Sequence, residues 1–315
     1  MSSSYTLICG SLAYDTIMDF DGRFKDRILP DQVHILNVCF MVPTLRREWG
    51  GCAGNIAYGL QLLNGRPLPH AMLGTDGQDY LARLQSLGID TRHICMSTTA
   101  MTAQAFITTD RDDNQITAFH PGAMTEAHDN PLDPRQDNIG LAIVAPDGRR
   151  AMLDHASALA QAGIPFVFDP GQGLPMFDGQ ELLAFVDQAH YVAVNDYEAR
   201  LLSDRTGLSL EKLAERVDTL IVTRGAEGAW IFNAGELVRI PCVPAEAIID
   251  PTGCGDAFRA GLLYGIAQGM DWPTIGRLAS TMGALKIAQR GGQNYAPDRA
   301  AVAERFAATF GYRPW

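Results

Sequence analysis

The sequence predicts an α/β protein whose core is a buried, mostly parallel β-sheet. Short β-rich runs alternate with segments of helical spacing through most of the 315 residues, and this alternation is typical of βαβ units. A hydrophobic content of 47% is enough for one large core. Neither an internal repeat nor a linker rich in Pro, Gly or Ser divides the chain. We therefore expect residues 1–315 to form a single domain.

The expected strands are apolar runs that are each followed by a helical pattern. In chain order they are YTLIC (5–9), HAML (70–73), LAIV (141–144), FVF (166–168), YVAV (191–194) and TLIVT (219–223). Apolar spacings of three and four residues predict helices over 55–63, 79–87, 149–162, 197–202, 257–268, 274–289 and 298–310. The carboxyl-terminal half is therefore expected to be the more helical.

Two segments, about 16–49 and 98–120, interrupt this rhythm. The second contains the alternating runs TAQAFITTD and NQITAFH, which are typical of antiparallel strands. We expect the two segments to pair into a small antiparallel sheet that lies over a cleft as a lid subdomain. The alternative is an ordinary antiparallel extension at the edge of the main sheet.

The composition limits the partners of the protein. The formal net charge is -11 and the only lysines are Lys25, Lys212 and Lys286, so no basic run is present to bind a nucleic acid or an anionic membrane. The six cysteines form no C-x-x-C pair and no metal-type cluster with the histidines, which favours a reducing compartment. Without a basic amino-terminal region or a run of eighteen apolar residues, the sequence favours a cytoplasmic protein with small-molecule ligands.

Small and acidic residues follow the predicted strands, at the edge where open parallel sheets bind ligands. The stretch IIDPTGCGDAFRAGLL (248–263) is the most informative. Gly253 and Gly255 tolerate any backbone angle and Cys254 is small, so several N–H groups can point at one position in front of a helix. This predicts an anion hole for a transferring phosphoryl group, with Asp256 placed to accept a proton from the attacking hydroxyl. The alternative is a simple turn in which Asp256 caps the helix.

Other phosphate and metal designs are absent from the sequence. No Gly-Lys dipeptide occurs, so there is no G-x-x-x-x-G-K-[ST] loop, and no G-x-G-x-x-G opens a helix after a strand. The histidines form no H-E-x-x-H motif. The sequence therefore argues against a P-loop enzyme and against an ordinary nicotinamide dehydrogenase.

Four motifs in series resemble those of the ribokinase-like (PfkB) carbohydrate and nucleoside kinases. They are GG at 50–51 followed by Asn55, NDYE at 195–198, TRG at 223–225 and DPTGCGD at 250–256. Their order and spacing match that family over nearly the whole chain. The resemblance implies a ribokinase-like three-layer α/β/α domain with a small antiparallel β lid, and a phosphotransferase that uses ATP and Mg2+.

The resemblance also implies roles for single residues. Asp256 would be the catalytic base, and the N–H groups of Gly253, Cys254 and Gly255 would hold the phosphate. The substrate pocket would be formed by Asp15, Gly50, Gly51 and Asn55, and the ATP site by Asn195, Thr223, Gly225, Gly228, Ser280 and Gly283. Gln172 could face the base of a nucleoside, and the alternative is an ordinary turn residue. Asn195 and Glu198 would organise Mg2+, whereas Asp250 and Thr252 would surround K+ as in potassium-activated relatives. The segment AQRGGQNYAP (288–297) would line the adenine site.

The acceptor is the least determined part of the prediction. Apolar side chains in the two lid segments could offer a flat surface to a nucleobase or could form a core of the lid, and they are Phe40, Met41, Val42, Met101, Phe106 and Phe119. The runs FHPGAM (119–124), FDPGQG (168–173) and GDAFRAGLLYG (255–265) resemble those of bacterial and archaeal adenosine and nucleoside kinases. This favours transfer to the 5'-hydroxyl of adenosine or inosine. A ribose or fructose kinase and a non-catalytic nucleotide or nucleoside sensor remain alternatives, as does a homodimer formed through the lid.

Overall fold

A nine-stranded sheet forms the centre of the molecule. The computed structural model describes residues 4–28, 37–112 and 114–315. The strands of this sheet are β1 (Tyr5–Cys9), β4 (Pro67–Leu73), β5 (Ile94–Met96), β8 (Ile139–Val144), β9 (Phe166–Phe168), β10 (Tyr191–Asn195), β11 (Thr219–Thr223), β12 (Ala229–Asn233) and β13 (Glu236–Ile240). Their order is β13-β12-β11-β10-β9-β8-β1-β4-β5. The pairs β11–β12 and β12–β13 are antiparallel, and the other neighbouring pairs are parallel.

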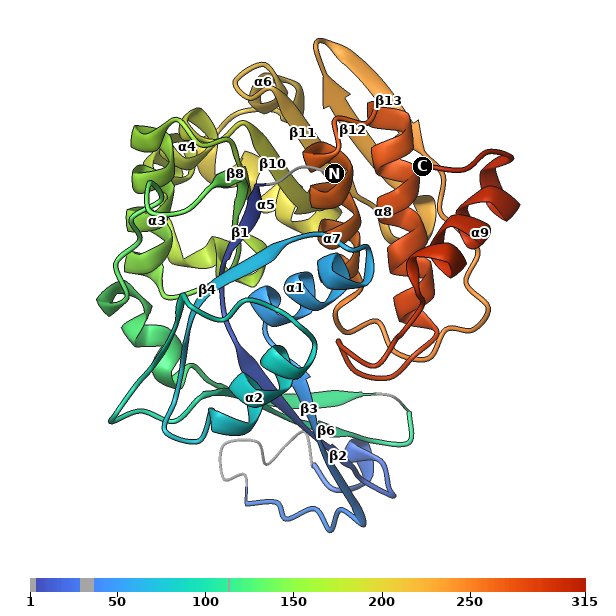
Figure 1. Ribbon diagram of the computed structural model, residues 1–315. Helices are drawn as coiled ribbons and strands as arrows, with labels where there is room; N and C mark the ends of the chain where they lie inside the picture. Colours follow the sequence, from blue (N-terminus) through green and yellow to red (C-terminus); the bar gives the residue numbers. More distant parts are fainter. Residues whose placement is uncertain (1–3, 29–36, 113) are drawn as a thin grey trace.

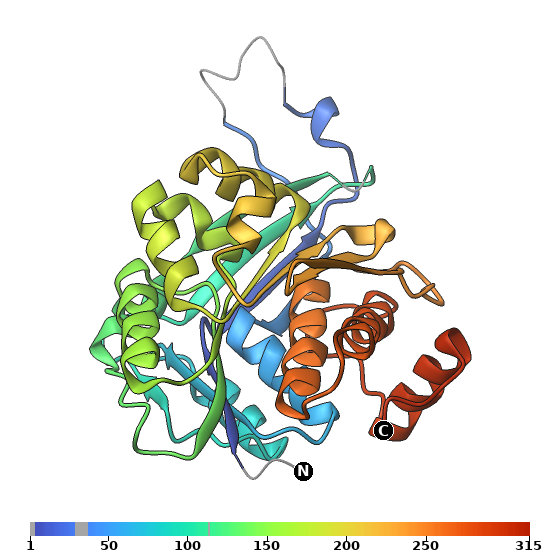
Figure 2. The same cartoon turned by 90° about the horizontal axis from the view of Figure 1, so that it is seen from above.

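Helices cover both faces of this sheet (Figures 1 and 2). On one face a hydrophobic core includes side chains of α1 (Cys52–Leu62), α2 (Gln78–Ser86), α7 (Cys254–Ala267), α8 (Trp272–Ile287) and α9 (Arg299–Phe310). On the other face a second core includes those of α3 (Arg149–Ala162), α4 (Gly179–Gln188), α5 (Asp196–Thr206) and α6 (Leu210–Ala214). Successive strand residues alternate between the cores: in β11, Ile221 belongs to the first, and Leu220 and Val222 to the second. The predicted three-layer α/β/α architecture is confirmed.

A separate four-stranded sheet, called the small sheet below, extends from one end of the main sheet (Figure 1). Its strands are β2 (Ala13–Asp19), β3 (Thr44–Gly50), β6 (Ala103–Thr109) and β7 (Gln115–His120), in the order β3-β2-β6-β7. They come from the two segments that interrupt the sequence pattern, although residues 29–36 of the first segment lie outside the described residues. The outer pairs β2–β3 and β6–β7 are antiparallel, and the central pair β2–β6 is parallel. The reason is that β2 and β6 both leave the main sheet in the direction of its parallel strands, one after β1 and the other after β5.

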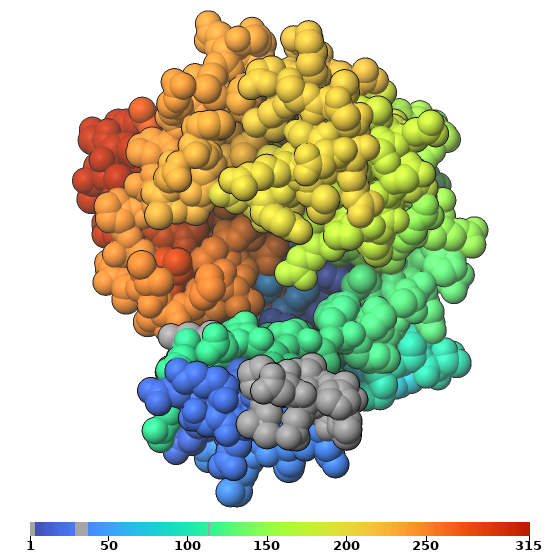
Figure 3. Space-filling model, turned by 180° about the vertical axis from the view of Figure 1, so that it is seen from behind, coloured from blue at the N-terminus to red at the C-terminus, as the bar shows by residue number. Residues whose placement is uncertain are grey.

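A hollow separates the small sheet from the main domain. Figure 3 shows it between the blue and teal atoms of the small sheet and the yellow and orange atoms of the carboxyl-terminal half. The main sheet turns the carboxyl ends of its parallel strands toward this side, because β2 follows the carboxyl end of β1. The hollow therefore lies where open α/β sheets bind their ligands.

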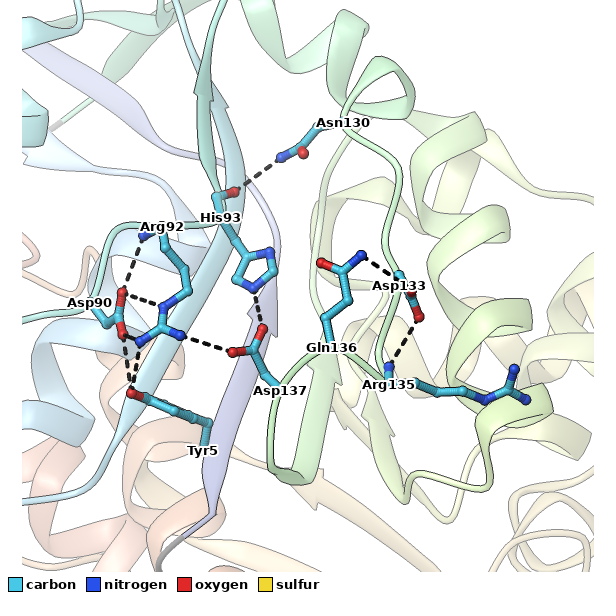
Figure 4. A network of polar contacts seen from close by, with 9 residues as sticks. All are labelled: Tyr5, Asp90, Arg92, His93, Asn130, Asp133, Arg135, Gln136 and Asp137. Atoms are coloured by element: carbon cyan, nitrogen blue, oxygen red, sulfur yellow. Dashed lines mark hydrogen bonds and ion pairs between the residues drawn. The ribbon is translucent and has the colours of Figure 1, made fainter.

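A network of polar contacts connects the amino-terminal ends of the strands, on the side of the sheet opposite the hollow (Figure 4). The carboxylate of Asp137, just before β8, lies 2.6 Å from His93 Nε2 and 3.0 Å from Arg92 Nη1. Arg92 also contacts Asp90 and the Tyr5 hydroxyl. These contacts join the beginnings of β1, β5 and β8, so we assign this network to the stability of the fold.

Among the helices of the described part of the chain, none reaches the length and hydrophobicity that crossing a bilayer needs.

Candidate active site

The turn that opens α7 leaves space in front of the helix. Gly253 has a φ of +75°, which glycine adopts without strain, and a Cβ on it would lie 3.1 Å from Gly292 Cα. A Cβ on Gly255 would have no neighbour within 4 Å. The Cys254 N–H donates to Pro251 O at 3.1 Å, whereas the N–H groups of Gly253 and Gly255 have no acceptor among the described residues. These two donors and the positive end of α7 therefore face an open position.

Asp256 lies in the first turn of α7, beside this position. Its side chain is half-buried, and Asn55 Nδ2 donates to its Oδ2 at 2.8 Å. Burial raises the pKa of Asp256 to about 7; the Asn55 hydrogen bond and Arg259 lower it, and Asp169 and Asp15 add to the increase. A carboxylate with a pKa near neutrality is suited to accept a proton in catalysis at physiological pH.

Asn55 is held by a chain of hydrogen bonds that sequence reasoning missed. Gln293 Nε2 lies 3.2 Å from Asn55 Oδ1 and 2.6 Å from the Tyr80 hydroxyl, which in turn donates to Gly50 O at 2.6 Å. Because Gln293 fixes the Asn55 oxygen, the amide nitrogen is the end that points at Asp256. These hydrogen bonds connect the loop between α8 and α9 to α1, to α2 and to the end of β3. No sequence signal ties Gln293 to Asn55, since they lie 238 positions apart.

A buried ion pair supports the same turn of α7. Arg259 Nε and Nη2 donate to the Asp169 carboxylate at 3.0 and 3.2 Å, and both side chains are at most 8% exposed. Arg259 lies one helical turn after Asp256, and Asp169 follows β9. Asp169 directly follows the predicted strand 166–168, which puts it among the acidic residues expected at the ligand-binding ends of the strands, but nothing in the sequence indicates that Arg259 is its partner.

Asn195 and Glu198 form a capping box at the start of α5. Glu198 N–H donates to Asn195 Oδ1 at 2.8 Å, and the Asn195 backbone and side-chain amides donate to the two Glu198 carboxylate oxygens at 2.8 Å each. Burial, followed by the charge of Asp169, raises the pKa of Glu198. Asp169, Glu198 and Asp256 all interact with the Arg259 guanidinium, and three carboxylates around this one side chain favour a further bound cation. The described residues contain no cluster of three His, Cys, Asp or Glu that could hold a metal unaided.

The remaining residues expected at the ATP site lie on three elements. Thr223 ends β11, and Gly225 has a φ of +53° with open space around it. Gly283 on α8 is also open, since a Cβ there would meet only Cys254 O at 3.8 Å, and Ser280 is half-buried one turn earlier. Packing alone requires a glycine at position 228, because its φ is +85° and a Cβ would lie 2.0 Å from Ile240 O.

Asp250 joins the loop before α7 to the loop after α8. Its carboxylate accepts from Thr252 N–H and Gly291 N–H at 2.8 Å each. Burial opposes ionisation, but these hydrogen bonds and the nearby Lys286 ammonium outweigh it and hold the pKa of Asp250 below its usual value. The segment expected to line the adenine site thus packs, at residues 291–293, against Asp250 and Asn55. The Thr252 side chain is half-buried beside them.

The substrate side of the hollow is one face of the small sheet. Strand register and alternation put Asp15, Glu48, Ala105 and Phe119 on this face, and Asn294 Nδ2 reaches across to Glu48 Oε2 at 2.7 Å. Burial, followed by Asp250 and Glu48, raises the pKa of Asp15 to about 6. No hydrogen-bond donor among the described residues reaches the Asp15 carboxylate, which leaves it available to ligand hydroxyls.

The glycine pair makes room for this face. A Cβ on Gly50 would lie 2.5 Å from Asp15 Oδ2, and one on Gly51, whose φ is +84°, would lie 2.5 Å from Ser11 O. The structure places Gln172 in the 3-10 helix Gly171–Met176 after β9, with an exposed side chain. It lies at the same edge of the sheet as Asp169.

Comparisons with known proteins identify the family. The model of the "pfkB family carbohydrate kinase" matches residues 17–299. The chain belongs to the PfkB family of carbohydrate kinases. A nucleoside kinase of Methanocaldococcus jannaschii is 31% identical to this PfkB-family chain over 271 residues, which are 85% of the chain and 89% of that protein.

Solved structures agree with the fold and the family. The structure of Burkholderia thailandensis nucleoside kinase in complex with inosine is 56% identical to this chain, with a TM-score of 0.89 and coverage of 98% and 99% of the two chains. The structure of the same kinase in complex with ADP-inosine is 58% identical, with a TM-score of 0.87 and coverage of 98% and 97%. The PfkB-family chain is therefore a phosphotransferase with an alcohol group as acceptor, and ATP is its expected phosphate donor.

Proposed function

We propose that this kinase transfers the γ-phosphoryl group of ATP to the 5'-hydroxyl of a purine ribonucleoside. The observation that carries the proposal is the position of Asp256, at the open start of α7 and opposite a substrate wall that contains Asp15. The Burkholderia kinase, whose structures with inosine and with ADP-inosine align along nearly all of the chain, supports a nucleoside as the acceptor.

In this proposal Asp256 removes the proton of the attacking hydroxyl. Asn55 orients the carboxylate by donating to one of its oxygens, and the N–H groups of Gly253 and Gly255 stabilise the charge on the transferring phosphoryl group. The Cys254 N–H would join them once its bond to Pro251 O is released. Asp15 accepts hydrogen bonds from the ribose hydroxyls, and Gly50 and Gly51 allow the Asp15 carboxylate and the Ser11 backbone to pack closely behind the sugar.

The ATP phosphates would lie between α7 and α5. Mg2+ favours one or two carboxylates together with phosphate oxygens and water, and the excess of carboxylates around Glu198 fits such an ion. Glu198, held by Asn195, would bind it through water; when present, Mg2+ neutralises charge on the phosphates. Thr223, Gly225, Ser280 and Gly283 would line the nucleotide, and Gly228 would shape the turn behind Gly225.

The charge and shape of the substrate wall favour a nucleoside over a sugar phosphate. Asp15 and Glu48 are acidic, while Arg46 is paired with Asp19 at 3.1 Å and Arg47 with Asp76 at 3.1 Å. No unpaired cation of the described wall is therefore left for a substrate phosphate. Phe119 shares the face of Asp15 and is 53% exposed, so its ring is accessible for stacking on a base. Gln172 would approach the base from the main sheet.

We further propose that the small sheet acts as a lid, so that residues 1–315 work as one domain with a movable cover. Closure over the hollow would exclude water and prevent phosphoryl transfer to solvent. Strand β7 is exposed along its length, so the same sheet offers an edge through which two copies could pair.

The test is ADP release from ATP and Mg2+ with adenosine, inosine, guanosine, cytidine, ribose, fructose and fructose phosphate as acceptors. Release with purine nucleosides that is lost in Asp256→Asn supports the proposal. Asp298→Asn is the matched control, because it makes the same change at the exposed start of α9, where asparagine also caps. Release with free sugars alone would favour the sugar kinase, and ATP binding without release would favour the sensor.

A further inference from the structure

A buried lysine lies where the two loops beside the phosphate position meet. Lys286, near the end of α8, is fully buried, and its Nζ donates to Asp250 O at 2.8 Å and to Gln289 O at 3.0 Å. Burial lowers the pKa of Lys286, and the charges of Asp250, Cys254 and Asp256 oppose that effect. The two carbonyl acceptors and the nearby Asp250 carboxylate favour the protonated amine, which places a positive charge beside the loop that opens α7.

The contacts around this ammonium hold the two loops together. Ile249 N–H and Asp250 N–H both donate to Ile287 O, at 2.9 and 3.1 Å, and the Asp250 carboxylate accepts from Gly291 N–H at 2.8 Å. Lys286 adds the only charged donor of this set. Its two carbonyl acceptors belong to the loop before α7 and to the loop after α8, so its charge draws the negative ends of two peptide groups toward one position.

Backbone carbonyls that converge beside a carboxylate are the ligands that a hard monovalent cation would use. The resemblance to potassium-activated kinases implies such a cation at Asp250 and Thr252. The residues present do not fit it, because Lys286 Nζ already lies at hydrogen-bond distance from Asp250 O. A potassium ion on the same oxygen would sit against a like charge in a buried place.

We propose that Lys286 replaces the monovalent cation, fixing the 250–253 loop by its ammonium group so that the kinase works without potassium. Lys286 is then a positioning residue, because it acts on the anion hole through the Asp250 carbonyl and does not touch the phosphate. This inference rests on the proposed function for its activity assay but not for its binding assay.

The first experiment uses the unaltered kinase. ADP release with inosine is measured in KCl, NaCl and tetramethylammonium chloride at equal ionic strength, and we expect equal rates in the three salts. A several-fold increase in KCl alone would overturn the proposal without any variant.

The second experiment replaces Lys286 with methionine, which keeps an unbranched apolar chain and removes the charge. We expect kcat in NaCl to fall by about tenfold or more, since losing a single anion-hole donor costs about 10²–10³ in kcat. KCl or NH4Cl should restore much of the loss. Lys212→Met, at an exposed lysine on α6 that pairs with Glu215, is the matched control and should respond to no salt. Normal activity in Lys286→Met without potassium, or a loss that neither cation restores, would overturn the proposal.

A binding readout separates this inference from the proposed function. An ion that binds the folded state alone raises Tm, so KCl in place of NaCl should raise the Tm of Lys286→Met and leave that of the unaltered protein unchanged. If no nucleoside is phosphorylated but this Tm difference is found, the proposed function fails and the role of Lys286 stands. An equal response of the two proteins to KCl would contradict it. If Lys286→Met does not fold, Lys286→Gln is measured in its place, and the salt series on the unaltered protein still decides.

Discussion

Replacing Asp256 with asparagine should slow catalysis and stabilise the fold at the same time. Asparagine cannot take up the proton of the attacking hydroxyl, so kcat should fall by about 10²–10⁴-fold. Its side-chain oxygen can still accept the hydrogen bond from Asn55 Nδ2. The substitution therefore removes the charge and leaves the local contact, which links any change in stability to ionisation.

The size and sign of the stability change follow from the pKa of Asp256, which burial raises from its ordinary 3.8 to about 7. The folded protein holds the proton more tightly than the unfolded chain, so ionisation lowers the free energy of unfolding as pH rises from about 4 to 7. At 1.36 kcal/mol for each pKa unit, the cost above pH 7 is at most about 4 kcal/mol, and about 2 kcal/mol of it is already present at pH 5. Water in the cleft reduces both figures. Asp256→Asn should regain this free energy, and the gain should grow with pH.

Urea unfolding at pH 5 and pH 8 measures this gain. We expect Asp256→Asn to exceed the unaltered protein in free energy of unfolding by more at pH 8 than at pH 5. The Asp298→Asn control, at an exposed helix cap, should show no such pH-dependent gain. A variant that is no more stable at pH 8, or whose advantage does not depend on pH, would refute the assigned environment of Asp256. Near-normal turnover would refute its role as the base.

Three further substitutions test neighbouring parts of the site. Asn55→Ala removes the hydrogen bond that lowers the pKa of Asp256, so the rise of kcat/KM with pH should move to higher pH; an unchanged pH–rate profile would contradict this. Phe119→Ala should raise KM for inosine and leave KM for ATP unchanged. If the variant and the unaltered protein had the same KM for inosine, Phe119 would not contact the base. Arg259→Met leaves the buried Asp169 without its partner, so urea unfolding should show a loss of about 3–5 kcal/mol; a loss under about 1 kcal/mol would contradict the ion pair.

The main sheet was predictable because its strands are buried on both faces. The runs YTLIC, FVF and TLIVT coincide with β1, β9 and β11, since strands between two helix layers are continuously apolar and short. Helix α3 has the bounds 149–162 that the spacing predicts. Helix α4 was missed although Asp178 and Glu181 form a capping box, a signal that the sequence does contain.

The small sheet shows where sequence reasoning stops. Alternating residues predict its strands, but the parallel pairing of β2 with β6 depends on where both leave the main sheet. The register that brings Phe119 onto the face of Asp15 joins residues more than a hundred positions apart through β6. No local propensity encodes such a contact.

The site divides in the same way. Asp256, Gly253 and Glu198 were predictable because they lie in short motifs whose spacing carries their chemistry. Gln293 and Lys286 were not, since each acts through contacts made only after α8 and its following loop have packed. A single lysine in a predicted helix is usually on the surface, so the sequence gives no sign that Lys286 is buried.

The central claim is that this kinase phosphorylates a nucleoside at its 5'-hydroxyl, and the most direct measurement is the ³¹P NMR spectrum of the product formed from inosine, ATP and Mg2+. The account predicts a phosphate monoester coupled to the methylene protons of C5', formed by the unaltered protein and not by Asp256→Asn. A phosphate coupled to a ring proton of the ribose, or ADP formed without any nucleoside ester, would contradict it.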